Sequence, residues 1–229
     1  MQLGILAALY RLSTLTYEFL RDSLPARRRQ RYGDIDFDWE HRVNTTAATV
    51  TWRSRLMGML NSAYQPIPPE QFREMMAALA DHLEGDRTFR GFTFIDIGSG
   101  KGRALLLASQ FGFRRIIGVE LLPELHNVAR ENVLHCQQRS GNPRIELICG
   151  DGATFCLPAE PSVIFLFNPL PEAAFRVFME NTERSLLQYP RPTFVVYANP
   201  VFAQTVSAIP SLQKLGGTHQ YLLFRSSGG

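Results

Sequence analysis

The sequence of 229 residues has few cysteines, very few lysines and only a small excess of positive charge. Its three cysteines form no CxxC pair, which argues against a disulfide scaffold and a zinc knuckle; we predict a reducing, cytoplasmic location and no metal site. The net charge of +3 is too small to indicate nucleic-acid binding. Lys101 and Lys214 are the only lysines among 24 basic residues, and we expect Lys101 to face solvent rather than a cofactor.

No uncharged apolar run is long enough to span a membrane. The leucine-rich spacing of residues 1–24 predicts one helix that ends at Pro25, but Arg11 and Glu18 interrupt it, and a span needs ~20 apolar residues. No Lys or Arg precedes Arg11, so a secretory signal is not indicated. We expect this helix to cover the main domain or a partner chain. The alternative is peripheral contact with an anionic membrane, helped by the arginines within residues 27–31.

The first 60 residues differ in pattern from the rest of the chain. Acidic and apolar residues alternate over residues 32–41, and this period of two predicts an extended segment with one apolar face. Three prolines and then a helical pattern follow Asn61, directly before the main fold. We therefore predict two parts, a helix with an extended segment over residues 1–60 and a larger domain over residues 61–229.

Strand-like and helix-like segments alternate from Phe92 onward. Strands are predicted at FTFIDI, RRIIGVE, RIELICGD, SVIFLFNP and PTFVVYANP. Such alternation is typical of a parallel sheet covered by helices on both faces. The last two apolar segments, near SLQKLG and HQYLLFR, are too close together for a crossover helix and predict an antiparallel pair. The expected fold is α/β, a seven-stranded, mostly parallel sheet with an antiparallel last strand, preceded by an N-terminal helical extension.

The most informative string is DIGSGKGR, from Asp96 to Arg103. A dinucleotide-binding turn has a third glycine where this chain has Arg103, so NAD is disfavoured. A phosphate-binding loop has Ser or Thr after its lysine, where this chain has Gly102, so ATP is disfavoured too. What remains is a glycine turn that brings the backbone close to an uncharged or carboxylate-bearing ligand.

Three acids, Asp96, Glu120 and Asp151, fall at the ends of the first three predicted strands. The carboxyl ends of parallel strands form the rim where open α/β sheets bind ligands, and acids there can meet hydroxyl or ammonium groups. Each feature alone has a plainer interpretation, since a glycine turn can serve tight packing and an acid can cap a helix. Together they predict a small-molecule site.

With these motifs the chain, over residues 92–225, resembles the class I S-adenosylmethionine-dependent methyltransferases. DIGSGKG resembles the first motif of that family, IIGVE its acidic second strand, ICGDGA its adenine-contacting turn and FNPLP its fourth motif. The resemblance implies S-adenosyl-L-methionine as the cofactor. The cofactor-binding residues that it implies are Tyr64, Asp96, Gly98, Ser99, Gly100, Glu120, Leu121, Asp151 and Gly152.

The resemblance also implies a part for most of these residues. The glycines of the first motif would approach the methionine part of the cofactor, and Glu120 would hold the ribose hydroxyls. Leu121 would lie against adenine, and Asp151 would bind its amino group. Tyr64 resembles part of a cofactor-covering loop found in some lysine methyltransferases of this fold.

Methyl transfer is an in-line displacement, so the protein mainly aligns the two partners and excludes water. In relatives that methylate amino groups, an Asn-Pro-Pro-aromatic motif accepts hydrogen bonds from the target nitrogen. The resemblance assigns this catalytic role to Asn168, although Leu170 and Pro171 depart from the motif. A second pair, Asn199 and Pro200, ends the fifth predicted strand. These pairs face an amine in one interpretation and are ordinary turn residues in the other.

We therefore predict an enzyme, an S-adenosylmethionine-dependent methyltransferase that methylates a nitrogen (amine or amide) on a protein acceptor. The alternatives are a methyltransferase for a small-molecule or lipid-associated substrate, and a non-catalytic cofactor-binding scaffold. The intact glycine turn and the three acids favour a working cofactor pocket over a relic.

Overall fold

The computed structural model describes residues 37–46, 66–83, 85, 87–140, 145–167 and 170–227. The chain divides into two compact units, residues 1–41 and residues 42–229. The domain boundary predicted at residue 60 falls outside the described residues.

The described part of the first unit, Phe37–His41, is a single helical turn. The ring of His41 stacks on that of Phe37 with 4.2 Å between the centroids, and His41 Nδ1 lies at hydrogen-bond distance, 3.0 Å, from the Phe37 carbonyl oxygen. Residues four apart meet on a helix and not on a strand. The extended conformation predicted for residues 32–41 is therefore wrong over this turn, because local contacts four residues apart outweigh the two-residue period.

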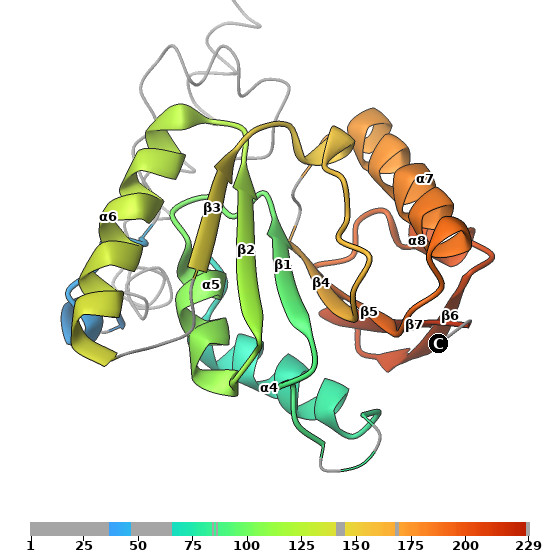
Figure 1. Ribbon diagram of the computed structural model, residues 1–229, viewed down its shortest axis with the longest axis horizontal. Helices are drawn as coiled ribbons and strands as arrows, with labels where there is room; N and C mark the ends of the chain where they lie inside the picture. Colours follow the sequence, from blue (N-terminus) through green and yellow to red (C-terminus); the bar gives the residue numbers. More distant parts are fainter. Residues whose placement is uncertain are drawn as a thin grey trace, which may run out of the picture. The chain divides into compact units, whose positions relative to one another are not determined.

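The second unit contains a seven-stranded sheet in the order β3-β2-β1-β4-β5-β7-β6 (Figure 1). The strands are β1 (Thr93–Ile97), β2 (Arg115–Glu120), β3 (Ile145–Cys149), β4 (Ser162–Phe167), β5 (Thr193–Ala198), β6 (Leu212–Gly217) and β7 (Tyr221–Ser226). Strands β1 to β5 run parallel, and β7 is antiparallel to both of its neighbours. The predicted α/β fold with an antiparallel last strand is confirmed.

Helices surround this sheet (Figure 1). They are α4 (Pro69–Ala80), α5 (Arg103–Ala108), α6 (Pro123–Ser140), α7 (Glu172–Gln188) and α8 (Ala203–Ser207), with short 3₁₀ turns η1 (Ser109–Phe111) and η2 (Gly152–Thr154). Proline begins both α4 and α6, where its fixed φ suits the first helical turn. None of the helices in the described ranges combines the length and the apolar composition that crossing a bilayer requires.

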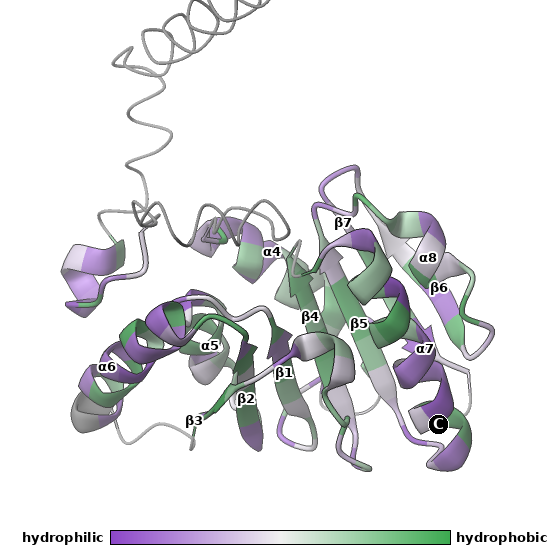
Figure 2. Ribbon diagram, turned by 90° about the horizontal axis from the view of Figure 1, so that it is seen from above, coloured by the Kyte–Doolittle hydropathy of each residue, from purple (hydrophilic) through white to green (hydrophobic). Residues whose placement is uncertain are grey.

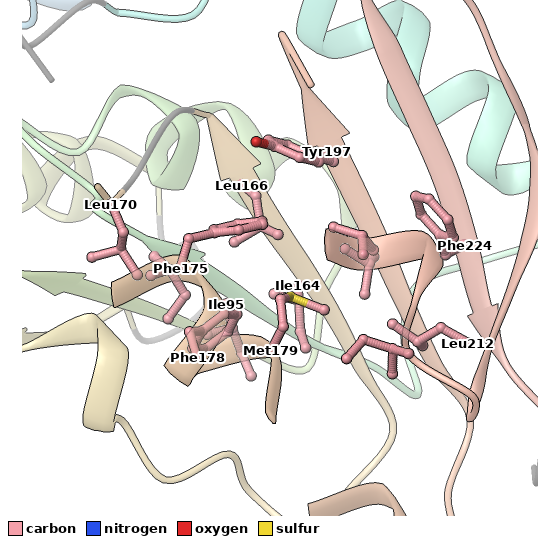
Figure 3. Packing of buried hydrophobic residues seen from close by; sticks show 14 of the residues in the cluster. Ile95, Ile164, Leu166, Leu170, Phe175, Phe178, Met179, Tyr197, Leu212 and Phe224 are labelled. Carbon is pink, nitrogen blue, oxygen red and sulfur yellow. The ribbon is translucent and has the colours of Figure 1, made fainter. Parts of the chain in front are cut away.

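Strand β1 is buried along its whole length, and its side chains alternate between the two faces of the sheet. On one face Phe94 packs with Phe165 of β4 and Phe72 of α4, with ring centroids 5.3 to 5.9 Å apart. On the other face Ile95 belongs to a cluster with Phe178 of α7 (Figure 3). The central strands are accordingly hydrophobic, whereas α6 and α7 carry hydrophilic stretches (Figure 2). Because these rings are closely packed, truncating one of them to alanine should lower the free energy of unfolding by about 3–5 kcal/mol.

The strand order changes direction between β1 and β4, because β2 and β3 lie on one side of β1 while β4 and β5 lie on the other. Ligands of open α/β sheets bind at such a switch point, outside the carboxyl ends of the strands. The loops that follow the parallel strands all begin at this edge. The fold therefore brings the glycine turn after β1 and the acids after β2 and β3 to one rim.

Candidate functional site

The turn after β1 requires glycine. Gly98, Gly100 and Gly102 have φ angles of 75°, 53° and 85°, in the left-handed region that other residues rarely adopt. The amides of Gly98 and Ser99 donate hydrogen bonds to the carbonyl oxygen of Val119 at 2.8 and 2.9 Å, so the turn is fixed to the end of β2. Gly98 is exposed, which leaves its backbone accessible to a ligand.

Glu120, the last residue of β2, is 7% exposed. Its Oε2 accepts a hydrogen bond from the amide of Gly100 and its Oε1 one from the amide of Leu122, each at 2.8 Å. Burial raises the pKa of Glu120, and the backbone hydrogen bonds partly offset that rise. A carboxylate has about four lone-pair positions, so Glu120 can hold the turn and still accept hydrogen bonds from hydroxyl groups of a ligand.

Asp96 lies in β1, two residues before the turn, and is 4% exposed. Burial raises the pKa of Asp96 to about 8, and the nearby charge of Glu120 adds to the rise. Within the described ranges, no side-chain hydrogen bond links Asp96 to another residue. Its carboxylate would be stabilised by a positive charge. The position therefore favours a ligand that brings an ammonium group.

The Ser99 hydroxyl packs against Gly118 of β2. A Cβ at residue 118 would lie 3.0 Å from Ser99 Oγ and 2.5 Å from Leu105 Cδ1, so a side chain there would displace that of Leu105. The hydroxyl is buried and has no hydrogen-bond partner among the residues that the structure describes. Ser99 therefore packs the turn onto β2, and its contact with a cofactor stays a prediction.

The turn after β3 carries Asp151 and Gly152. Asp151 is exposed, and its Oδ1 caps η2 by accepting a hydrogen bond from the amide of Ala153 at 2.9 Å. Gly152 is buried against the end of β1, where a Cβ would lie 2.7 Å from Ile97 Cγ2. Asp151 is thus a helix cap as well as a candidate ligand contact, and glycine at residue 152 allows the close approach to β1.

Leu121 directly follows β2 at the same rim and is 45% exposed. The amide of Gly150 donates to the carbonyl oxygen of Glu120 at 2.9 Å, which holds the end of β3 beside the end of β2. An exposed leucine next to a buried acid can offer an apolar surface to a flat ring. Tyr64 and Asn168 lie outside the described residues, and their roles stay predictions.

Three buried polar residues within or beside the turn are not among the predicted site residues: Lys101, Arg103 and Asn132. The expectation that Lys101 faces solvent is wrong, because the residue is only 4% exposed. Its Nζ donates to Asn44 Oδ1 at 2.9 Å and to the Thr46 carbonyl oxygen at 2.8 Å. The scarcity of lysine was a signal for this role, but partners 55 and 57 residues away leave no local pattern.

Strand β5 ends at the same rim in a second left-handed turn. Asn199 has a φ angle of 47°, a conformation that asparagine tolerates better than most residues. Its amide donates to the Gln220 carbonyl oxygen at 2.7 Å, and the Val201 amide donates to the Asn199 carbonyl oxygen at 2.8 Å. The Phe202 amide donates to Tyr197 Oη at 3.1 Å. These bonds fix the turn and leave the side chain of Asn199 exposed.

One protein family matches the chain. A sequence model of the family described as protein-L-isoaspartate(D-aspartate) O-methyltransferase matches residues 69–162, from the start of α4 to the first residue of β4. The matched part contains β1, β2, β3 and the turns that follow them. No curated protein sequence matches the chain.

Solved structures with a similar arrangement share little sequence with the chain. A candidate RNA methyltransferase from Pyrococcus horikoshii is 16% identical, with a TM-score of 0.49 over 72% of this chain and 88% of that one. An RNA methyltransferase from Salinibacter ruber in complex with S-adenosyl-L-homocysteine is 20% identical, with a TM-score of 0.47 over 70% and 92% of the two chains. A ribosomal protein L11 methylase from Lactobacillus delbrueckii subsp. bulgaricus is 14% identical, with a TM-score of 0.46 over 71% and 80%.

Proposed function

The chain belongs to the class I S-adenosylmethionine-dependent methyltransferases, and from this premise we propose that it methylates a nitrogen atom of a protein. The matched family model and the sheet order with an antiparallel β7 are the two observations behind the premise. The enzyme is therefore a methyltransferase and its cofactor is S-adenosylmethionine.

The rim suits this cofactor in charge and in shape. Asp96, buried and with its pKa raised to about 8, is the position for the ammonium group of the methionine part. Glu120 is placed to accept hydrogen bonds from the two ribose hydroxyls while it holds the amide of Gly100. Leu121 and Asp151, at the neighbouring part of the rim, are the proposed contacts for the adenine ring. When bound, S-adenosylmethionine supplies an electrophilic methyl group.

A protein acceptor is supported by the name of the matching family, whose members act on proteins. The match does not extend to the carboxyl ends of β4 and β5, since it stops at Ser162. In the proposed arrangement those ends form the half of the rim that receives the acceptor. The family match therefore supplies no evidence about the acceptor atom at those ends.

The turn after β5 is the single observation that supports nitrogen. Its backbone hydrogen bonds hold Asn199 in a left-handed conformation with the side chain exposed. An amide oxygen there accepts a hydrogen bond from an amine N–H and so directs the lone pair of the nitrogen toward the methyl group. Because the amide is neutral, it does this without neutralising the positive charge of the sulfonium. This suits an in-line displacement that depends on alignment. Asn168, which follows Phe167 in the sequence, remains the predicted partner.

The test is to identify the atom that receives the methyl group. Purified protein, methyl-labelled S-adenosylmethionine and a lysate of the host are incubated together, and the labelled fraction is separated into protein, lipid and small molecules. We expect label in protein that survives mild base and that is found on a methylated amine or amide after enzymatic digestion of the protein. Label released as methanol by mild base would identify a carboxyl ester instead, and label in lipids or small molecules would contradict a protein acceptor.

Two variants make this experiment specific. Asn199→Gly keeps the left-handed backbone that glycine adopts freely but removes the amide, so we expect about a tenfold loss of transfer with unchanged affinity for S-adenosylhomocysteine. Exposed Asn127 on α6 gives the matched control, and Asn127→Gly should leave transfer within twofold once the protein is folded. Full activity of the Asn199→Gly protein would show that the Asn199 amide takes no part in methyl transfer.

A further inference from the structure

Residues Asn44–Thr46 precede the predicted cofactor-binding domain, yet they are bonded to its glycine turn. We infer that these three residues form a strap, and that Lys101 and Asn132 are positioning residues which tie the strap to the turn and thereby set the affinity for the cofactor. The inference rests on cofactor binding at the turn and is independent of the acceptor. It adds residues that neither the resemblance nor the matched family model assigns.

Lys101 connects the turn to the strap directly. It lies between Gly100 and Gly102, and its buried ammonium group donates to an oxygen of Asn44 and one of Thr46. Burying an ammonium group costs several kcal/mol unless hydrogen bonds replace its lost hydration. The strap supplies such hydrogen bonds, so a turn that places Lys101 inside the protein depends on the strap being in position.

Asn132 of α6 fixes the strap from a second direction and is 3% exposed. Its Oδ1 accepts from the Asn44 amide at 2.8 Å, and its Nδ2 donates to the Asn44 carbonyl oxygen at 3.0 Å. Nδ2 also donates to the carbonyl oxygen of Lys101 at 3.0 Å. One side chain therefore satisfies both backbone groups of Asn44, as a neighbouring strand would, and also holds the backbone of the turn.

Arg103 completes the attachment at the start of α5. It is 1% exposed, and its Nε donates to the hydroxyl of Thr45 at 2.6 Å. Thr45 is fully buried. All three residues of the strap are thus bonded to the glycine turn, to the helix that follows it, or to α6, through hydrogen bonds whose partners lie 55 to 88 residues apart in the chain.

The turn needs this support because three left-handed glycines give it little intrinsic stiffness. A turn that is already ordered loses less conformational entropy when a ligand binds, which raises affinity. By linkage, a ligand that binds the ordered turn must stabilise the strap by the same free energy. Lys101 and Asn132 act through the turn, so they need not touch the cofactor.

Calorimetry with S-adenosylhomocysteine tests the inference in the full-length protein. Lys101→Met and Asn44→Ala each remove the same hydrogen bond from opposite ends, and Asn44→Ala leaves the turn sequence intact. We expect each variant to bind about tenfold more weakly than the wild type. The double variant should bind about as tightly as the weaker-binding single variant, because the effects of substitutions at residues in contact are not additive. The control is Lys214→Met, which changes the other lysine, exposed on β6, and should bind like the wild type.

Hydrogen exchange supplies a measurement that a purely structural role would not change. In the wild type S-adenosylhomocysteine should slow exchange of the backbone amides in residues 42–46, and this protection should be lost in Lys101→Met. Wild-type affinity in both single variants, or amides in residues 42–46 that do not respond to S-adenosylhomocysteine, would overturn the inference. Because neither measurement involves methyl transfer, a wrong acceptor in the proposed function would leave both results unaffected.

Discussion

The glycine turn has acidic residues on one side and basic residues on the other, and the two groups are stabilised in different ways. Asp96 and Glu120 lie on one side, buried acids whose pKa values are raised above their ordinary range. Lys101 and Arg103 lie at the other, equally buried but hydrogen-bonded to residues of the strap. The chain itself provides partners for the basic side, whereas a cation on a ligand would relieve the acidic side. From this difference we propose that the acidic side is the ligand site and that the basic side supports it.

Of the changes that test this comparison, removing the acid that holds the turn should lower ligand affinity the most. Glu120→Ala deletes the acceptor for the amides of Gly100 and Leu122 and the proposed acceptor for the ribose. Hydrogen bonds to a charged group contribute about 1.5–3 kcal/mol each, so we expect affinity for S-adenosylhomocysteine to fall about 100-fold or more, measured by calorimetry.

Glu146→Ala is the control for that loss. Glu146 lies in β3 and pairs with Arg115, with both side chains about 40% exposed, at the end of the sheet where β2 begins. Exposed ion pairs of this kind contribute about 0–1 kcal/mol to stability, and binding should be unchanged. If Glu120→Ala bound S-adenosylhomocysteine as well as Glu146→Ala does, the acidic side would not be the ligand site.

Titration of Asp96 should give the next largest effect. Its pKa in the folded protein is about 8, against 3.8 as the ordinary value, so between these values the folded state binds more protons than the unfolded state. The free energy of unfolding of the ligand-free protein should therefore decrease as pH rises from about 4 toward 8. Urea unfolding at pH 5 to 8 measures this, and Asp96→Asn should remove the part of the slope that Asp96 contributes.

The same titration predicts how ligand affinity depends on pH. An ammonium group beside Asp96 favours the charged carboxylate, so binding releases a proton below the pKa of about 8. Affinity for S-adenosylhomocysteine should increase by up to about tenfold per pH unit between pH 6 and 8, and this dependence should be absent in Asp96→Asn. An affinity that falls over that range would place the ammonium group elsewhere.

The acidic side was predictable from the sequence, and the basic side was not. Asp96, Glu120 and Asp151 each follow a short apolar run, and parallel strands bring such positions to one rim whatever the details of packing. Lys101 and Asn132 acquire their roles from the backbone of Asn44, 57 and 88 residues earlier, through hydrogen bonds that impose no periodicity on the sequence. Sequence patterns report local geometry, and the strap depends on contacts between distant segments.

The difference between local patterns and long-range contacts also explains why two predictions are wrong, the extended segment over residues 32–41 and the exposure of Lys101. The alternation over residues 32–41 predicts an extended segment, but the ring contact between Phe37 and His41 belongs to a helical turn at Phe37–His41. Lysine is usually exposed, which predicts Lys101 in solvent, but its hydrogen bonds to Asn44 and Thr46 of the strap hold it inside the protein. The strand order, in contrast, follows from the alternation of long segments, where many residues contribute to one pattern.

The smallest effect is expected where the strap meets α5 rather than the turn. Thr45→Val keeps the side-chain shape but removes the hydroxyl that accepts from Arg103 Nε. We expect the free energy of unfolding to fall by about 1 kcal/mol, measured by urea titration, and affinity for S-adenosylhomocysteine to change by no more than about threefold. Thr218→Val is the control, because Thr218 Oγ1 also accepts a hydrogen bond, from the backbone amide of Gln220, but Thr218 is exposed. Losing this hydrogen bond should lower the free energy of unfolding by less than about 0.5 kcal/mol.

The affinity of Thr45→Val decides how the strap supports the turn. Arg103 lies one residue beyond Gly102, so its bond to Thr45 anchors the start of α5, whereas Lys101 lies within the turn. If Lys101 is the connection that orders the turn, losing the Thr45 hydroxyl lowers stability and leaves affinity almost unchanged. A loss of affinity as large as that of Lys101→Met would instead mean that the strap acts as one unit, and the distinction between the positioning lysine and the anchoring arginine would be wrong.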